Sequence, residues 1–376
     1  MSLDKLPLHG HPLNGLMGQP RAIRILGGML MTGRIVPAYL FTGAPGTGKK
    51  TAAFSFIKAM NCEDGGSVRE GNFCGRCRSC KNTDLLVHPD LKVMAPEDTV
   101  KKTGKTGNAD KADNAESSGQ PREASRVIQI DQIREAVDFL STSAMEWKGK
   151  AIIIKDAHAM NVYAGNAFLK TLEEPPAGSI IVLITNKEDA VLDTIRSRCV
   201  KIPFVPLSFE VLRAIADKNG ASPTDEQLGL SNGSASAMLN DTLISGRNRA
   251  LQMFTEMVNG NKTYQWKDRQ EMALWFEAAM SFLRDMAVLK LGQGGTALVN
   301  MDKKAEFANL CKAVDIEVIV DCYETLFSLS RYFAVNINKG IVFNYTALKL
   351  RDVFGRVTPS QRGLSSASQG AREGVY

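Results

Sequence analysis

A glycine-rich segment at residues 43–51, with the sequence GAPGTGKKT, limits the fold of this chain more than any other feature. It follows a short apolar stretch at residues 38–43, which we expect to be a strand, and leads into residues 51–60, which have the pattern of a helix. Its glycines and Lys49 have the spacing of a phosphate-binding loop (P-loop), in which backbone N–H groups surround phosphates and the lysine binds their outer oxygens. The order strand, loop, helix predicts an α/β fold.

Beyond the loop, short apolar stretches alternate with amphipathic ones. We expect strands at residues 150–157, 179–186 and 200–204, and helices at residues 18–34 and 161–176. Residues 127–140 are expected to form a short strand and then a helix. This alternation is typical of a largely parallel sheet covered by helices on both faces. From residue 247 to residue 354 the pattern is helical.

Two positions that hold Mg²⁺ in a working nucleotide site carry lysine here. The P-loop pattern requires Ser or Thr after its lysine, but the residue is Lys50, and Thr51 comes one position late, about 100° further around the helix. The acidic pair expected at the end of the second buried strand is Lys155–Asp156. Because ammonium groups repel Mg²⁺, which neutralises charge in phosphoryl transfer, we expect no ATP hydrolysis by this chain alone.

The sequence leaves nucleotide binding itself open. The candidate ligands are Gly43, Gly46, Gly48 and Lys49. Lys49 and Lys50 together offer positive charge for a metal-free di- or triphosphate, whereas a loop kept only for its geometry would bind none. The alternative from another functional class is a self-contained ATPase, which requires that Thr51 or Asp156 holds the metal.

Four of the seven cysteines lie in one short stretch. They are Cys62, Cys74, Cys77 and Cys80. Four thiolates at this spacing suit a tetrahedral Zn²⁺ in a knuckle, and an iron–sulfur cluster, which takes the same ligands, is the alternative. Because the stretch contains no histidine and leaves no open position, we expect a structural metal. Cys199, Cys311 and Cys322 stand apart and are expected to be ordinary thiols.

The composition excludes several classes of protein. Of 376 residues, 44% are hydrophobic and 23% charged, as in globular rather than fibrous or disordered proteins. The chain has no run of about 18 apolar residues, which a membrane span requires, and its first residues lack the apolar core of a secretory leader, so we expect a cytoplasmic protein. The formal net charge of +6 is compatible with nucleic-acid contact but does not require it.

Shifts in composition predict several segments. We expect a P-loop domain (residues 1–206) with a knuckle (62–80) and a polar, flexible insertion (96–125), a small helical lid domain (207–246), an all-helical domain (247–356) and a disordered tail (357–376).

Several stretches together resemble the AAA+ module of bacterial DNA polymerase III clamp-loader subunits over residues 15–206. They are GQPRAI, AYLFTGAPGTGKKT, the four-cysteine knuckle, HPDL, IDQIRE, NAFLKTLEEPP and IRSRC, of which LKTLEEPP and SRC are the most specific. The helical lid and an all-helical collar fit the family more loosely. Motor subunits of the family carry Thr or Ser where this chain has Lys50 and an Asp–Glu pair at Lys155–Asp156. The chain therefore resembles the stator-like members without ATPase activity.

The resemblance assigns roles to residues that the sequence alone describes only as surface or strand-end groups. Arg196 and Arg198 by themselves indicate arginines at a helix end. In the family, the arginine of the SRC motif, here Arg198, reaches in trans into a neighbouring motor subunit's ATP site as an arginine finger. The sensor position falls at Thr185 or Asn186.

The resemblance also implies partners and a cofactor. The partners are the motor (gamma/tau) and delta subunits in a hetero-pentamer, the sliding clamp, and primed DNA reached through the complex. The cofactor is structural zinc. The motor subunit itself, a self-contained AAA+ ATPase, remains the alternative.

Overall fold

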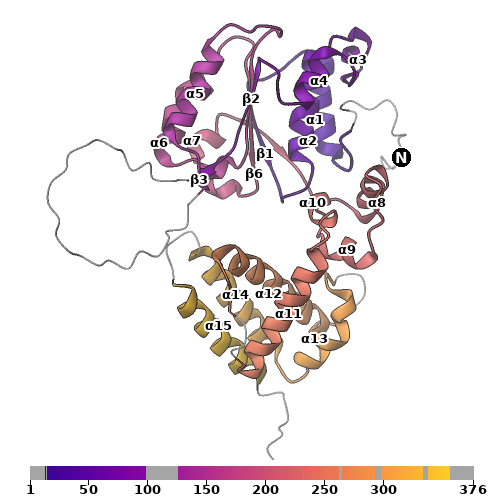
Figure 1. The fold of residues 1–376 in the computed structure, drawn as a ribbon, viewed down its shortest axis with the longest axis vertical. Coiled ribbons are helices and arrows are strands. Elements are labelled where there is room, and N and C mark those ends of the chain that lie inside the picture. The colour runs from indigo at the N-terminus through magenta and orange to yellow at the C-terminus, as the bar shows by residue number, and fades with distance from the viewer. Residues whose placement is uncertain are drawn as a thin grey trace, which may run out of the picture. The chain divides into compact units, whose positions relative to one another are not determined.

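The computed structural model describes residues 13, 15–98, 126–261, 265–292, 298–332 and 338–355. The chain forms two compact units, residues 1–215 with 233–236 and residues 216–232 with 237–376 (Figure 1). Most of the predicted insertion, and the predicted tail, lie outside the described residues. Among the helices that the structure describes, none has the length and apolar character to cross a membrane.

The first unit is built on a parallel sheet of five strands in the order β2-β5-β6-β1-β7. The strands are β1 (Ala38–Thr42), β2 (Leu91–Met94), β5 (Ala151–Ile154), β6 (Ile180–Thr185) and β7 (Val200–Pro203). The predicted parallel sheet is thereby confirmed, and β2 is added to it. A separate antiparallel pair joins β3 (Glu97–Asp98) to β4 (Arg126–Val127), so the first residues of the predicted insertion are paired.

Helices cover both faces of this sheet (Figure 1). On one face lie α1 (Pro20–Thr32) and α2 (Lys49–Asn61), and on the other α5 (Ile130–Ser141) and α6 (Val162–Glu173). Successive residues of β1 alternate between the two layers: Tyr39 and Phe41 pack with α1 and α2, and Leu40 with α5 and α6. Because both faces are covered, every residue of β1 is buried, which explains its continuous apolar sequence.

Short helices complete the first unit and lead into the second. They are α3 (Gly65–Arg69), α4 (Arg78–Asp84), α7 (Asp193–Arg196), α8 (Phe209–Lys218), α10 (Ala235–Met238) and two 3₁₀ turns, Ala157–Ala159 and Glu188–Ala190. Local sequence sets the ends of α6. The Asn161 side chain accepts a hydrogen bond from the Ala164 N–H at its start, and Pro175 and Pro176 follow its end.

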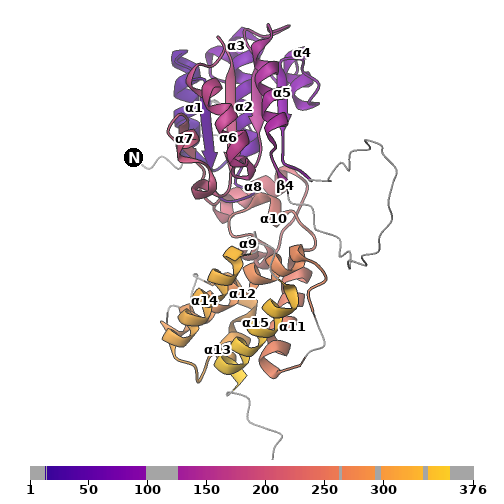
Figure 2. The same cartoon turned by 90° about the vertical axis from the view of Figure 1, so that its left-hand side faces the viewer.

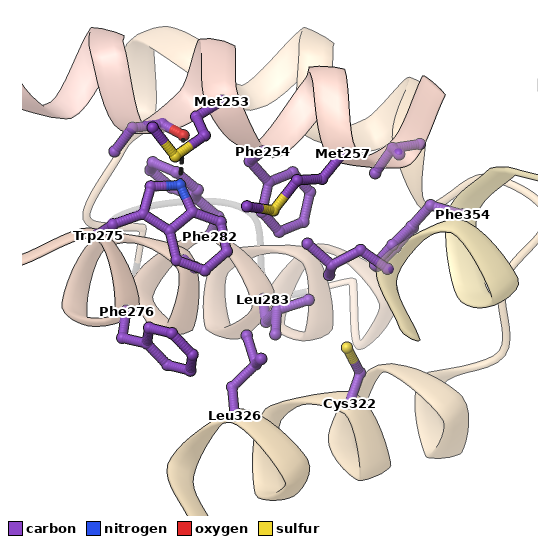
Figure 3. Packing of buried hydrophobic residues seen from close by; sticks show 14 of the residues in the cluster. Met253, Phe254, Met257, Trp275, Phe276, Phe282, Leu283, Cys322, Leu326 and Phe354 are labelled. Carbon is purple, nitrogen blue, oxygen red and sulfur yellow. Dashed lines mark hydrogen bonds between the residues drawn. The ribbon is translucent and has the colours of Figure 1, made fainter. Parts of the chain in front are cut away.

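The second unit is helical, as predicted. It contains α9 (Asp225–Leu230), α11 (Leu243–Asn259), α12 (Arg269–Lys290), a 3₁₀ turn (Met301–Lys303), α13 (Lys304–Leu310), α14 (Ile316–Arg331) and α15 (Lys339–Phe354). Figure 2 shows α12 beside α14 and α11 beside α15. Their shared core is aromatic: Phe254 packs edge-on against Phe282, and Trp275 donates from its indole N–H to the Ala250 carbonyl at 3.1 Å (Figure 3).

Candidate functional site

The predicted P-loop lies at the carboxyl end of β1 and turns directly into α2. Its glycines have positive φ angles, 141° at Gly43 and 71° at Gly46. At Gly43 a Cβ atom would lie 2.2 Å from the Phe204 carbonyl oxygen, so only glycine fits beside β7. The strand, loop and helix are therefore arranged as the sequence predicts.

The side chain of Lys49 folds back over the loop. Its ammonium group donates to the carbonyl oxygens of Gly43 (2.6 Å) and Ala44 (2.5 Å), which belong to the loop itself. The residue is only 7% exposed. Burial lowers the pKa of Lys49 to about 8, an effect that the negative charge of Asp156 partly opposes. The cation that a P-loop offers to phosphate is thus bonded to the loop backbone in this structure.

Residues from much further along the chain cover the loop. The Ala235 N–H donates to the Gly46 carbonyl at 3.0 Å. A Cβ atom at Gly46 would lie 2.0 Å from Ser234 Oγ and 2.5 Å from Ser236 Oγ, so this segment leaves no room on that side. The covered loop was not predicted, because the sequence shows residues 231–236 only as a polar turn.

Of the two lysines at the expected Mg²⁺ positions, Lys155 is affected electrostatically by Lys50. Lys155 follows β5, and its pKa is lowered first by burial and then by the positive charge of Lys50, while Asp156 raises it. Lys50 is exposed at the start of α2, with its ammonium group 5.7 Å from the centre of the Phe54 ring. The structure therefore places the two predicted substitutions close enough for the charge of Lys50 to act on Lys155.

Protein groups also satisfy the expected sensor position. Thr185, at the end of β6, is fully buried, and its hydroxyl accepts the Lys187 N–H at 3.0 Å. His158 Nδ1 lies 3.1 Å from the same hydroxyl, and burial lowers the pKa of His158. Sequence reasoning missed His158, although its place just after the Lys155–Asp156 pair is a signal for it.

The four cysteines of the predicted knuckle converge. Their Sγ atoms all lie within 4.8 Å of one another, and those of Cys62 and Cys77 are 4.0 Å apart. Tetrahedral zinc with Zn–S bonds of about 2.3 Å places its sulfurs about 3.8 Å apart, so the spacing fits. Three backbone N–H groups donate to the sulfurs, those of Cys74, Cys77 and Cys80, at 3.3–3.4 Å. The cysteines thus form a possible metal site.

The HPDL motif joins the knuckle to the sheet. Asp90 is buried and accepts three backbone N–H groups, from residues 145–147, at 2.7–2.9 Å. These bonds position Trp147, whose indole stacks on His88 with 3.8 Å between ring centres and donates to Ser79 Oγ at 2.8 Å. Because Ser79 lies in α4 beside Cys80, this network fixes the knuckle against β2.

The two arginines of DTIRSRC have different partners. Arg196 pairs with Asp193 and, at 3.6 Å, with Asp189. Arg198 pairs with Glu173, the last residue of α6, and its side chain is 33% exposed. Both guanidinium groups are therefore held by carboxylates of this unit, and only the Glu173 pair joins two motifs far apart in the sequence.

Comparisons with known proteins agree with these observations. A model of the family described as DNA polymerase III, delta subunit, matches residues 18–208, just over half of the chain. The chain belongs to this family. Two relatives are named DNA polymerase III subunit delta′. The one from Bacillus subtilis is 29% identical over 73% of this chain and 78% of its own length, and the one from Pseudomonas aeruginosa is 31% identical over 52% and 53%.

Relatives named tau and gamma match less strongly, which favours the delta-prime interpretation over the motor interpretation within this family. A solved gamma subunit-related protein from Thermotoga maritima is 17% identical, with a TM-score of 0.42 over 87% of this chain and 99% of that chain.

Proposed function

We propose that this member of the family is a delta-prime-type, non-hydrolysing subunit of a DNA polymerase III clamp loader. The observation that carries the proposal is the state of the P-loop. Lys49 is bonded to Gly43 and Ala44, and Lys50 and Lys155 stand where Mg²⁺ needs oxygen ligands. A loop with these substitutions lacks the ligands that hold the metal for hydrolysis.

We propose that the chain acts on a neighbour's nucleotide through Arg198. An arginine placed at the transferring phosphoryl group neutralises the charge that develops there, and such a residue can be supplied in trans. Arg198 lies after the short helix α7 in the turn before β7, with about a third of its side chain exposed, so it is accessible from outside the unit.

One reconstitution tests both parts. The purified chain alone should show no ATPase activity, and adding it to motor and delta subunits should raise theirs. Arg198→Ala should lower the ATPase rate of the complex by about a thousandfold, the lower end of what arginine fingers contribute, with assembly intact. ATP turnover by the chain alone, if Lys49→Ala abolishes it, would refute the non-hydrolysing role. An unchanged rate of the complex with Arg198→Ala would refute the arginine-finger role.

For the cysteine cluster we propose structural zinc. The knuckle holds α3 and α4 together outside the sheet, where few apolar contacts do so. Metal analysis of the purified chain should give one zinc per chain, and Cys77→Ser should abolish it, while Cys199→Ser should not. Visible absorption of iron–sulfur charge transfer would contradict zinc.

We propose that the partners are the motor and delta subunits in a hetero-pentamer, with the sliding clamp and primed DNA reached through it. The predicted domains then take the roles of P-loop module (1–206), lid (207–246) and collar (247–356). The mildly basic chain would help attract DNA phosphates without sequence preference. Because this work is done on the bacterial chromosome, we place the protein in the cytoplasm.

A further inference from the structure

The guanidinium group of Arg198 is held along one edge by a single carboxylate. Its Nε donates to Glu173 Oε1 at 2.8 Å, and its Nη2 donates to the same oxygen. Its Nη1 donates to two neutral groups of its own turn, the Thr194 carbonyl at 2.9 Å and Ser197 Oγ at 3.3 Å. The two edges of the guanidinium therefore differ, because one meets a charged acceptor and the other only neutral ones.

Helix stability does not account for a carboxylate at Glu173. It is the last residue of α6, and a negative charge in the last helical turn interacts unfavourably with the helix dipole. The chain turns immediately afterwards at Pro175 and Pro176, which fix the direction in which α6 ends. The position of Glu173 is therefore better explained by its contact with Arg198.

Close packing fixes the two motifs relative to each other. At Gly165 of α6, a Cβ atom would lie 2.3 Å from Leu192 Cδ1 and 3.5 Å from Ile195 Cδ1. The absence of a side chain there lets the segment before Arg198 rest directly on α6. Both members of the ion pair thus belong to a rigid assembly, as precise positioning requires.

We propose that Glu173 is a positioning residue for Arg198, which it orients toward the terminal phosphate of a nucleoside triphosphate bound by a neighbouring subunit. This rests on the proposed arginine-finger function. The carboxylate of Glu173 adds Coulombic attraction that the neutral oxygens of Thr194 and Ser197 lack, so an incoming phosphate exchanges with those two at Nη1 while Glu173 keeps its edge. The guanidinium plane then stays fixed during the reaction.

This arrangement predicts a particular kinetic change. An arginine finger acts on charge that develops in the transition state, so losing its orientation lowers kcat and leaves the KM for ATP, which the motor subunit sets, unchanged. We expect Glu173→Ala to lower kcat of the reconstituted complex by about tenfold, since misplacing a catalytic group is costly. Glu173→Gln, which keeps an acceptor oxygen, should retain part of the rate.

The test uses the full complex with a matched control and a double variant. Glu174→Ala, which removes a neighbouring carboxylate that makes no ion pair with the described residues, should leave the rate unchanged. Adding Glu173→Ala to Arg198→Ala should cause no further loss, because Glu173 acts only through Arg198.

The outcomes separate the two proposals. If Arg198→Ala lowers the rate but Glu173→Ala leaves it unchanged or raises it, the positioning role is wrong and the arginine finger stands. A further loss in the double variant, or failure of Glu173→Ala to assemble, would show a structural role and also overturn the inference. An unchanged rate with Arg198→Ala would overturn the finger and the positioning role together.

Discussion

At the scale of single residues, the sequence predicts which chemical groups are present better than it predicts where their side chains point. The cysteine quartet and the lysines at positions 50 and 155 could be singled out because spacing alone places them, and the structure brings the four thiols together as a possible metal site. The inward turn of Lys49 was not predictable, because its acceptors, the Gly43 and Ala44 carbonyls, become available only through the loop's φ angles. The Glu173–Arg198 pair depends likewise on tertiary packing across 25 positions.

The buried ammonium of Lys49 predicts a pH effect on stability. Its pKa is about 8 in the folded chain and 10.5 for an ordinary lysine. Between these values the unfolded chain binds more protons at this position, so the free energy of unfolding should rise with pH across the window. The full gain is at most about 3 kcal/mol. Urea unfolding from pH 8 to 10.5, followed by circular dichroism, measures it.

The matched control is Lys148→Met, which removes an exposed lysine. Lys49→Met should flatten the rise with pH, whereas Lys148→Met should keep it. Equal slopes for the unmodified chain and Lys49→Met would show that the two carbonyl acceptors fully compensate the burial of the charge.

At the scale of elements, continuous apolar runs made the central strands predictable. β5 and β6 are buried along their whole length and were found within one to three residues at each end. β2 was missed because it is short, carries Lys92 and buries only its two end residues fully. Sequence patterns also do not predict where the backbones of two elements approach each other closely.

The backbones of the segments that precede β5 and β6 come close together at Gly149 and Gly178. A Cβ atom at Gly149 would lie 2.0 Å from the Gly178 carbonyl oxygen, which is backbone and has no room to move. We expect Gly149→Ala to destabilise the chain by about 1–3 kcal/mol, as overpacking does. Calorimetric melting measures this as a lower Tm.

Gly28→Ala provides the comparison, since a Cβ atom in that part of α1 would meet nothing within 4 Å. Replacing a helix-interior glycine at an open position should stabilise by up to about 1 kcal/mol. A Tm for Gly149→Ala equal to or above that of Gly28→Ala would contradict the close approach.

At the scale of the whole molecule, the helical half was predicted, but the division of the chain was not. Residues 233–236 belong to the first compact unit, although they lie beyond the first residues of the second. Residues 233–236 return to the first unit through two backbone hydrogen bonds, from the Ala235 N–H to the Gly46 carbonyl and from the Leu207 N–H to the Gly233 carbonyl. Sequence periodicity does not encode such contacts.

The helical unit carries exposed apolar stripes suited to assembly. On α14 they include Tyr323 and Phe327, whose rings stack 6.4 Å apart, and on α15 Ile341, Tyr345 and Leu348, all 37% or more exposed. These positions recur at helical spacing, and the two helices pack against each other. Exposed apolar patches of this kind mark protein interfaces.

We therefore expect Phe327→Asp to weaken binding to the proposed partners, the motor and delta subunits. The cost should be about 2 kcal/mol or more if Phe327 lies at the centre of an interface. Size-exclusion co-elution of the mixed subunits measures it. Leu291→Asp, at an exposed residue directly after α12, should still assemble, and loss of co-elution by both variants would point to general misfolding instead.

The closed P-loop has a consequence for timing. A subunit that binds nucleotide changes conformation according to whether ATP or ADP is bound, so its conformation follows the cellular ratio of the two. Here Lys49 is bonded to the backbone of the loop, and residues 234–236 of the chain itself lie against Gly46. Under the proposed function, this subunit would not change shape with each round of hydrolysis, and it would present Arg198 to its neighbour in the same way at every step.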